Sequence, residues 1–376
     1  MNTNYHNPVA ITFGAGTLEK LPGLVAGRRT VLVTFPEAAG FGLTRRIQDL
    51  LGANLIAIEP DTVPNPDIAS LTGMYERFWT QYADAELIVA VGGGSALDTA
   101  KALMVGTPSG QVSELVALLA TGKPFMPARV KPLITVPTTA GTGSEVTPWA
   151  TIWDRTPGAQ KKYSLHLAQT WPEAALVDPE LTLSLPAGPT LAAGLDALSH
   201  ALESIWNVNA NPISDTHAVS AAREVLAALP LLMKDLKNPA LRARMSLAAL
   251  KAGLAFSNTK TALAHSISYD MTMYHGLPHG IACSFTLPMV LGRATGKDPQ
   301  RDAVLAQVFD CPLNEAPAAL EAFLGTVGVS TDFASYGVGQ EEADQMIHKA
   351  LDGVRGKNFI GVAKAPVQAP VITPTT

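Results

Sequence analysis

The amino-acid sequence predicts an α/β domain followed by an all-helical domain. In the first half, short β-branched runs alternate with helical stretches, which is the pattern of a parallel sheet wrapped by helices. From about residue 186 the strand signals stop, and apolar residues recur at three- and four-residue spacing. We therefore expect an α/β domain over residues 1–185 and a helical domain over residues 186–376.

Each expected element follows from a particular run of residues. Strands are predicted at residues 30–35, 54–60, 85–94, 131–137 and 173–179. Helices are predicted at residues 41–52, 66–83 and 95–104, and in the second half at 189–206, 212–236, 239–256, 315–328 and 341–354. The tail from about residue 364 is rich in proline and threonine, and we expect it to be frayed.

The overall composition is that of a globular protein without a general affinity for anions. The 376 residues are 47% hydrophobic and 16% charged, and the net charge of -5 argues against nucleic acid and membrane surfaces as partners. No secretory signal or membrane-spanning run is expected. The two cysteines, Cys283 and Cys311, fit a reducing cytoplasm and are expected to be small buried apolar residues.

Two loops in the first half predict a binding site for a phosphorylated ligand. One follows the strand at residues 85–91 and opens a helix, so its backbone N–H groups can meet a phosphate; a tight turn with Ser95 as helix N-cap is the alternative. Its residues are Gly92, Gly93, Gly94 and Ser95. The second loop, "VPTTAGTGSEVTP", supplies hydroxyls from Thr138, Thr139, Thr142 and Thr147. Two such loops at one sheet edge would enclose an extended nucleotide.

A metal site is predicted in the second half. Asp196 and His200 are four residues apart, so on a helix they share one face; an ordinary helix contact is the alternative. The strip "NTKTALAHSISYDMTMYHGLPHGIAC" adds His265 and His279, and Pro278 with Gly280 is expected to form the turn that brings the two rings together. One carboxylate and three imidazoles suit Fe²⁺ or Zn²⁺.

These residues resemble the iron-containing, or group III, alcohol dehydrogenase family. The resemblance rests on motifs that occur in family-like order: "ITFGAGTLEKL", "VPNPD", "VGGGSALDTAK", "VPTTAGTGSEVT", "VDPELTLSLP", "AAGLDALSHALES", "PISD" and "GLPHG". It implies a Rossmann-like N-terminal domain, a helical C-terminal domain and a cleft site between them, an architecture also found in dehydroquinate synthase. It further implies metal ligation by Asp196, His200, His265 and His279. Cofactor contacts are implied for Gly92 to Ser95, for the four threonines, and for Asn65, Asp98 and Lys162.

The sequence departs from the family pattern in two places. Many members have a second histidine four residues after the first ligand of the strip, where this chain has Tyr269, so Tyr269 or His275 is the candidate for the proton relay. NAD-preferring members often have an acidic residue after the first strand, where this chain has Phe35 with Glu37 nearby. The cofactor is therefore NADP(H) or NAD(H), with a slight preference for NADP(H).

The predicted function is a metal-dependent, NAD(P)-linked oxidoreductase for a small alcohol and aldehyde pair, expected as a homodimer. The segment "SNTKTALAHSISY" resembles the branch that includes phosphonoacetaldehyde reductases, and Lys260, Arg355 and Lys357 are candidates for holding the anion. Three alternatives stay open: a general short-chain alcohol or polyol dehydrogenase, a lyase of the dehydroquinate synthase type, and a non-catalytic nucleotide sensor. Net consumption of NAD(P)H excludes the lyase, and turnover of any kind excludes the sensor.

Overall fold

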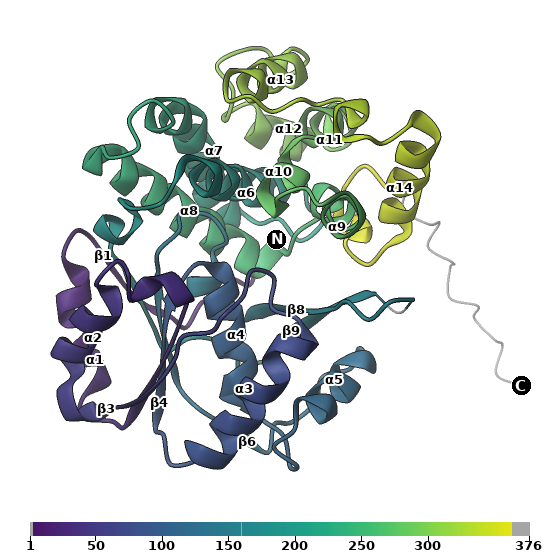
Figure 1. Cartoon of the computed structure of the whole chain (residues 1–376). Coiled ribbons are helices and arrows are strands. Elements are labelled where there is room, and N and C mark those ends of the chain that lie inside the picture. The colour runs from purple at the N-terminus through teal and green to yellow at the C-terminus, as the bar shows by residue number, and fades with distance from the viewer. Residues whose placement is uncertain (1–2, 159, 363–376) are drawn as a thin grey trace, which may run out of the picture.

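The computed structural model describes residues 3–158 and 160–362, which form a sheet region and a helical region stacked on each other (Figure 1). The prediction of a frayed tail from residue 364 lies outside these residues. The last strand, β10, ends at Val177 and the first long helix, α6, begins at Ala187. The α/β and all-helical fold class is confirmed, while the exact domain boundary near residue 186 stays a prediction.

A six-stranded parallel sheet forms the base of the first region. Its strand order is β1-β10-β7-β4-β2-β3. The five predicted strands are β2 (Thr30–Thr34), β3 (Leu55–Glu59), β4 (Leu87–Gly92), β7 (Leu133–Pro137) and β10 (Ala174–Val177). The sixth, β1 (Ala10–Phe13), was not predicted, because it is a short edge strand whose residues are mostly exposed and it lacks a buried apolar run.

Helices cover both faces of this sheet because successive strand residues point to opposite sides. Val31 and Val33 of β2 pack against α3 and α4, whereas Leu32 between them packs against α1 and α2. In Figure 1, α1 and α2 lie on one side of the strands and α3 and α4 on the other. The helices are α1 (Leu21–Val25), α2 (Leu43–Leu51), α3 (Ile68–Gln81), α4 (Gly94–Met104) and α5 (Val112–Ala120).

Two antiparallel pairs join the sheet region and were also not predicted. One is the short pair β5 (Val105–Gly106) and β6 (Arg129–Val130). The other is the hairpin of β8 (Trp149–Asp154) and β9 (Lys161–His166), which runs past α4 and projects outward below the helical region in the view of Figure 1. This hairpin is functionally important because β9 carries Lys162 into the cleft.

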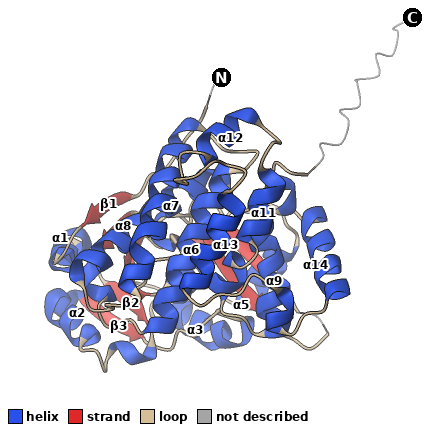
Figure 2. Cartoon of the chain, turned by 90° about the horizontal axis from the view of Figure 1, so that it is seen from above, coloured by secondary structure: helices blue, strands red, loops and turns tan. Residues whose placement is uncertain are grey.

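The helical region is built around α6 (Ala187–Ile205), which is buried on all sides from Gly194 to Ile205. Viewed from above, its helices lie over the sheet (Figure 2). They are α7 (Pro212–Leu232), α8 (Pro239–Thr259), α9 (Leu263–His275), α10 (His279–Ser284), α11 (Leu287–Ala294), α12 (Pro299–Leu305), α13 (Ala316–Thr326) and α14 (Gln340–Asp352).

Local sequence signals set several of these helix ends. Asn211 caps α7 by accepting from the backbone of Ile213 and Ser214, and Pro212 occupies the first helical position. Polar side chains are rarely buried on every side. The two carboxylates and the imidazole in the buried part of α6, Asp196, Glu203 and His200, therefore need partners inside the protein. None of the helices among the described residues is both long and apolar enough to cross a membrane.

Candidate active site

A cleft of about 1720 Å³ lies where the sheet region meets the helical region. It opens at the carboxyl ends of β2 and β4, the neighbouring strands from which the chain crosses to opposite sides of the sheet. Open parallel sheets bind ligands at this switch point. Of the predicted site residues, the cleft brings together Asn65, Gly93, Gly94, Ser95, Asp98, Thr138, Thr139, Thr142, Thr147, Lys162, Asp196, His200, Lys260, His265, Tyr269 and His279.

The glycine loop after β4 leaves room for a ligand against its backbone. Helix α4 begins at Gly94 with Gly93 as its N-cap, and no side chain caps it, so Ser95 does not act as the N-cap. The Ser95 hydroxyl instead accepts a hydrogen bond from the Asn65 backbone N–H at 3.0 Å. A side chain on Gly94 would lie 2.6 Å from Thr142, so only glycine lets the two predicted loops meet. The exposed helix start fits a phosphate group.

The second loop carries a fully buried hydroxyl that has no protein partner. Thr147 is fully buried and lines the cleft, and its Oγ1 makes no hydrogen bond. Asp98, by contrast, is occupied on both oxygens, because it accepts from the Ser144 hydroxyl at 2.8 Å and from the Thr151 backbone N–H at 2.9 Å. Asp98 therefore ties α4 to the second loop and to the hairpin, while the Thr147 hydroxyl has an unused hydrogen-bonding capacity beneath the cleft surface.

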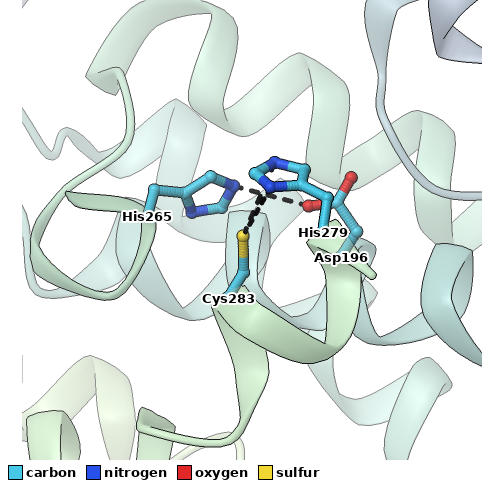
Figure 3. Close-up of side chains that lie close together, drawn as sticks. All are labelled: Asp196, His265, His279 and Cys283. Carbon is cyan, nitrogen blue, oxygen red and sulfur yellow. Dashed lines mark hydrogen bonds and ion pairs between the residues drawn. The ribbon is translucent and has the colours of Figure 1, made fainter. Parts of the chain in front are cut away.

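The four predicted metal ligands lie next to one another in the helical half of the cleft. His200 Nε2 lies 3.7 Å and His265 Nε2 3.4 Å from Asp196 Oδ1. The His200 ring stacks on the His265 ring with centroids 4.6 Å apart, and the His279 ring meets His265 edge-on at 5.6 Å. Figure 3 shows Asp196, His265 and His279 pointing toward a common centre.

The turn that brings His279 into place differs from the prediction. The chain reverses at Gly276, which has φ 68°, and at Pro278, the N-cap of α10; Gly280 lies inside α10 and is not part of the turn. Gly280 is needed for another reason, since a side chain there would meet the Ala192 backbone oxygen at 1.8 Å. It lets the start of α10, and with it His279, press against α6.

A buried carboxylate that sequence reasoning missed, Glu203 on α6, orients His265. Its oxygens accept from the backbone N–H groups of Ala262, Ala264 and His265 at 2.9, 2.6 and 3.2 Å, and from His265 Nδ1 at 2.6 Å. With Nδ1 donating to Glu203, Nε2 is the nitrogen that faces Asp196 and that would bind an ion after losing its proton. The signal was present in the sequence, because Glu203 follows Asp196 by seven residues and His200 by three and so lies on the same helix face.

The ionisation states suit metal binding. Burial lowers the pKa of His200 to about 4 and the pKa of His279 to about 3, so both rings are neutral and have lone pairs to share at pH 7. Burial acts against the charged form of Asp196, but the neighbouring His200 and His265 rings outweigh it and its pKa is lowered. An ionised carboxylate thus faces the neutral rings of His200 and His279, the form in which these groups bind metals. Burial opposes the charged form of His265, but the neighbouring Cys283 and Glu203 outweigh it and raise the pKa of that ring, so a metal ion must displace a proton from His265.

The unpaired atoms of the cluster show that a divalent ion fits. Asp196 Oδ1 and His265 Nε2, which face each other, are buried and make no hydrogen bond. His200 Nδ1 is also buried without a partner, but that ring faces Asp196 with its Nε2. Donor atoms about 2.1 Å from a tetrahedral ion lie about 3.4 Å from each other, which is the separation of Asp196 Oδ1 and His265 Nε2. Uncompensated buried polar atoms are costly, and an ion between them supplies the missing partner.

Three cations line the cleft beside this cluster. Lys162 Nζ lies 4.0 Å and the Arg355 guanidinium 4.8 Å from the centre of the Tyr269 ring, and Lys260 Nζ lies 5.9 Å from the Trp149 ring. None of the three forms an ion pair with a carboxylate among residues 3–158 and 160–362. The Tyr269 hydroxyl is buried and makes no hydrogen bond.

Three predicted residues do not line the cleft. Gly92 is the last residue of β4, and a side chain on it would lie 2.6 Å from Ala96. His275, at the end of α9, does not line the cleft. Its Nε2 lies 3.1 Å from Glu342 on α14, because nearly three further turns of helix carry it away from His265. Lys357 also lies outside the cleft, whereas Arg355 two residues earlier lines it. The structure therefore leaves Tyr269 as the relay candidate and replaces Lys357 with Lys162 among the cations.

Comparison with known proteins decides the family. Residues 8–179 match the family described as iron-containing alcohol dehydrogenase, and residues 190–371 match its C-terminal domain. The NAD-dependent methanol dehydrogenase of Bacillus methanolicus is 30% identical over 94% of this chain and 94% of its own length. The chain belongs to the iron-containing alcohol dehydrogenase family. It is accordingly an oxidoreductase that acts on CH–OH groups.

Two similar proteins act on a short anionic aldehyde, as their names state. The sulfoacetaldehyde reductase of Bilophila wadsworthia (strain 3_1_6) is 29% identical over 92% of this chain and 91% of its own length. The crystal structure of sulfoacetaldehyde reductase from Bifidobacterium kashiwanohense in complex with NAD⁺ superimposes with a TM-score of 0.86 at 29% identity, covering 96% of this chain and 94% of that one.

Proposed function

We propose that this dehydrogenase reduces a short aldehyde that carries a phosphonate group, with phosphonoacetaldehyde as the substrate. The observation that supports this most directly is the set of three cations, Lys162, Lys260 and Arg355, which line the cleft without carboxylate partners. Lys162 is close enough to His279 for its charge to lower the pKa of that ring. An anionic group bound by the cations would therefore place an aldehyde only two carbons long near the metal donors.

A phosphonate fits these cations better than a sulfonate does. Burial, followed by the repulsion of Arg355, lowers the pKa of Lys162 to about 7, so Lys162 holds its proton weakly in the empty site. A dianion offsets that repulsion more fully than the single charge of a sulfonate. The similarity to sulfoacetaldehyde reductases supports the size of the aldehyde and the presence of an anionic group.

The remaining roles follow from where each group lies. The proposed metal ligands are Asp196, His200, His265 and His279, and the two loops with Thr147 are proposed to hold the cofactor. When bound, the ion supplies Lewis-acid chemistry and the nicotinamide supplies hydride chemistry. Glu203 keeps the His265 ring in one tautomer. The Tyr269 hydroxyl is our candidate for the group that delivers a proton to the substrate oxygen, because it is buried at the cleft without a partner.

The cofactor is proposed to be NADP(H) in preference to NAD(H). Phe35 occupies the end of β2 at the cleft and contacts Phe41, so no carboxylate stands at the position that would repel a 2′-phosphate. Arg46 also lines this part of the cleft, where it pairs with Glu19 at 2.6 Å. Glu37 lies nearby and is exposed, so it can turn toward solvent.

The quaternary structure and compartment are also proposals. A homodimer is supported by the edge strand β1, which leaves Ile11 38% and Phe13 37% exposed. A monomeric mass in light scattering would contradict it. The reducing cytoplasm is supported by the two cysteines, which are both free thiols.

The substrate proposal is tested by following NADPH and NADH oxidation with phosphonoacetaldehyde, sulfoacetaldehyde and propanal, after metal analysis of the purified protein. We expect the highest kcat/KM with phosphonoacetaldehyde and the lowest with propanal. Lys260→Ala should lower kcat/KM for both anionic aldehydes and leave propanal unchanged. Lys349→Ala is the matched control, because Lys349 also lines the cleft but is already paired with Asp270 at 2.9 Å. Equal turnover of all three aldehydes would instead mean a general short-chain dehydrogenase.

A further inference from the structure

We propose that Cys283 is a fifth ligand of the metal ion and binds it through a thiolate, in addition to Asp196, His200, His265 and His279. This inference rests on the metal site of the proposed function and adds a donor that the sequence motifs did not indicate. Figure 3 shows the Cys283 sulfur pointing into the space between the other three side chains, toward the His279 ring.

The position of Cys283 follows from the helix that carries it. Cys283 comes four residues after His279 on α10, so the two side chains lie one above the other on the same face. The sulfur lies 3.6 Å from both ring nitrogens of His279. One donor atom from each of Asp196, His265, His279 and Cys283 lies within 4.8 Å of the other three. Four donors are therefore gathered around one point.

The spacing of two of these donors matches metal coordination as the side chains stand. Asp196 Oδ1 and His265 Nε2, 3.4 Å from each other and without hydrogen bonds, have the separation of two ligands of a tetrahedral ion. The Cys283 sulfur lies 3.6 Å from both ring nitrogens of His279, so it is equidistant from them. A thiolate and an imidazole on one ion are about 3.6 Å apart through one nitrogen only, so joint binding requires the His279 ring to turn until one nitrogen points at the ion.

The surroundings of Cys283 are not those of an apolar packing residue. The side chain is fully buried, yet it is not part of any of the four hydrophobic clusters in the described chain. The other cysteine, Cys311, does pack against the apolar core of the helical region. The expectation that both cysteines are small buried apolar residues is met by neither in full: Cys311 has apolar neighbours but is only half-buried, and Cys283 is buried but has imidazoles and a carboxylate as neighbours.

A thiolate ligand changes which metal ions the site prefers. Together with Asp196 it gives the ion two anionic donors, and sulfur is a soft donor that favours Zn²⁺ and Co²⁺ over Mg²⁺ and Mn²⁺. The bound ion keeps the thiol deprotonated. We therefore expect metal retention to depend on sulfur as well as on the histidines.

The test uses Co²⁺ as a spectroscopic probe. The full-length protein is stripped with a chelator and loaded with Co²⁺, and its absorption spectrum is recorded for wild type, Cys283→Ser and the control Cys311→Ser. Visible d–d bands report bound Co²⁺, and a near-ultraviolet charge-transfer band reports a sulfur ligand. We expect both features in wild type and Cys311→Ser. In Cys283→Ser the charge-transfer band should be lost and the d–d bands altered.

Each outcome decides the matter. Visible bands without the charge-transfer band in wild type overturn the thiolate ligand and leave the metal site standing. Retention of the band in Cys283→Ser also overturns it. If Cys283→Ser takes up no Co²⁺, the band in Cys311→Ser still assigns the sulfur, because the chain has only two cysteines. If wild type shows no visible bands at all, both the thiolate ligand and the proposed metal site fail.

Discussion

Replacing Glu203 with glutamine is expected to loosen the metal site without touching any proposed ligand. One carboxylate oxygen accepts from the backbone N–H groups of Ala264 and His265, and the other accepts from the Ala262 N–H and from His265 Nδ1. An amide offers only one acceptor oxygen, so two of the four buried donors lose their partner. Each unsatisfied donor costs about 1–3 kcal/mol, so the metal-free protein should lose on the order of 2–6 kcal/mol of unfolding free energy.

The effect on metal binding is separate from this loss of stability. Partners that orient a ligand typically contribute a factor of about 10–100 in metal affinity, and we expect a loss in that range for Glu203→Gln by competition with a coloured chelator. Glu145→Gln is the matched control, because Glu145 is also a buried glutamate but lies in the second phosphate loop away from the metal donors. If both variants bind the metal as tightly as wild type, Glu203 does not orient His265.

Three further outcomes are expected. Asp196→Ala and His279→Ala should each remove bound metal and nearly all turnover. NADPH affinity, measured by fluorescence, should stay within a few-fold of wild type, because the phosphate loops lie in the other half of the cleft. Full activity of the metal-free variants would refute the assignment of the metal ligands. Phe35→Asp should shift the kcat/KM ratio toward NADH, since an acid there repels the 2′-phosphate, and a shift toward NADPH would mean that Phe35 does not face the ribose. The charge of sulfoacetaldehyde is constant near neutrality. Its kcat/KM should therefore fall as pH rises above about 7, because the free enzyme then loses the Lys162 proton. The pH profile of kcat/KM for propanal should lack this fall, and identical profiles for the two aldehydes would exclude Lys162 from anion binding.

The sequence predicted the fold class and the centre of the site because both depend on local patterns. Buried apolar runs identify β2, β3, β4, β7 and β10 by composition alone, and a four-residue spacing places Asp196 and His200 on one face of a helix. The hairpin of β8 and β9 was missed because antiparallel pairing depends on which segments meet, and neither strand has a continuous apolar run. The position of Lys162 therefore needed the structure.

The same limit explains His275 and Cys283. Both lie in the strip that supplied two predicted ligands, but ten residues of helix carry His275 from the cluster to Glu342, whereas one helical turn keeps Cys283 beside His279. From residue type alone, His275 was a candidate for the proton relay and Cys283 was taken as a packing residue. The position of each residue around its helix determines which side chain lies at the cluster, and it selects Cys283 rather than His275. That position can be worked out only when α10 is known to begin at His279.

The cations in the cleft would favour an anionic substrate because they have no carboxylate partners of their own. Burial lowers the pKa of Lys162 to about 7 and the pKa of Arg355 to about 10, and neither has a carboxylate partner in the described chain. Their charges are therefore least favourable when the cleft is empty. An anionic aldehyde relieves that unfavourable state as it binds, whereas an uncharged aldehyde of the same size leaves the two cations repelling each other. On the proposed function, selectivity for the anion would follow from the instability of the empty site. Replacing Arg355 with a neutral residue should then raise the pKa of Lys162 and weaken discrimination between charged and uncharged aldehydes.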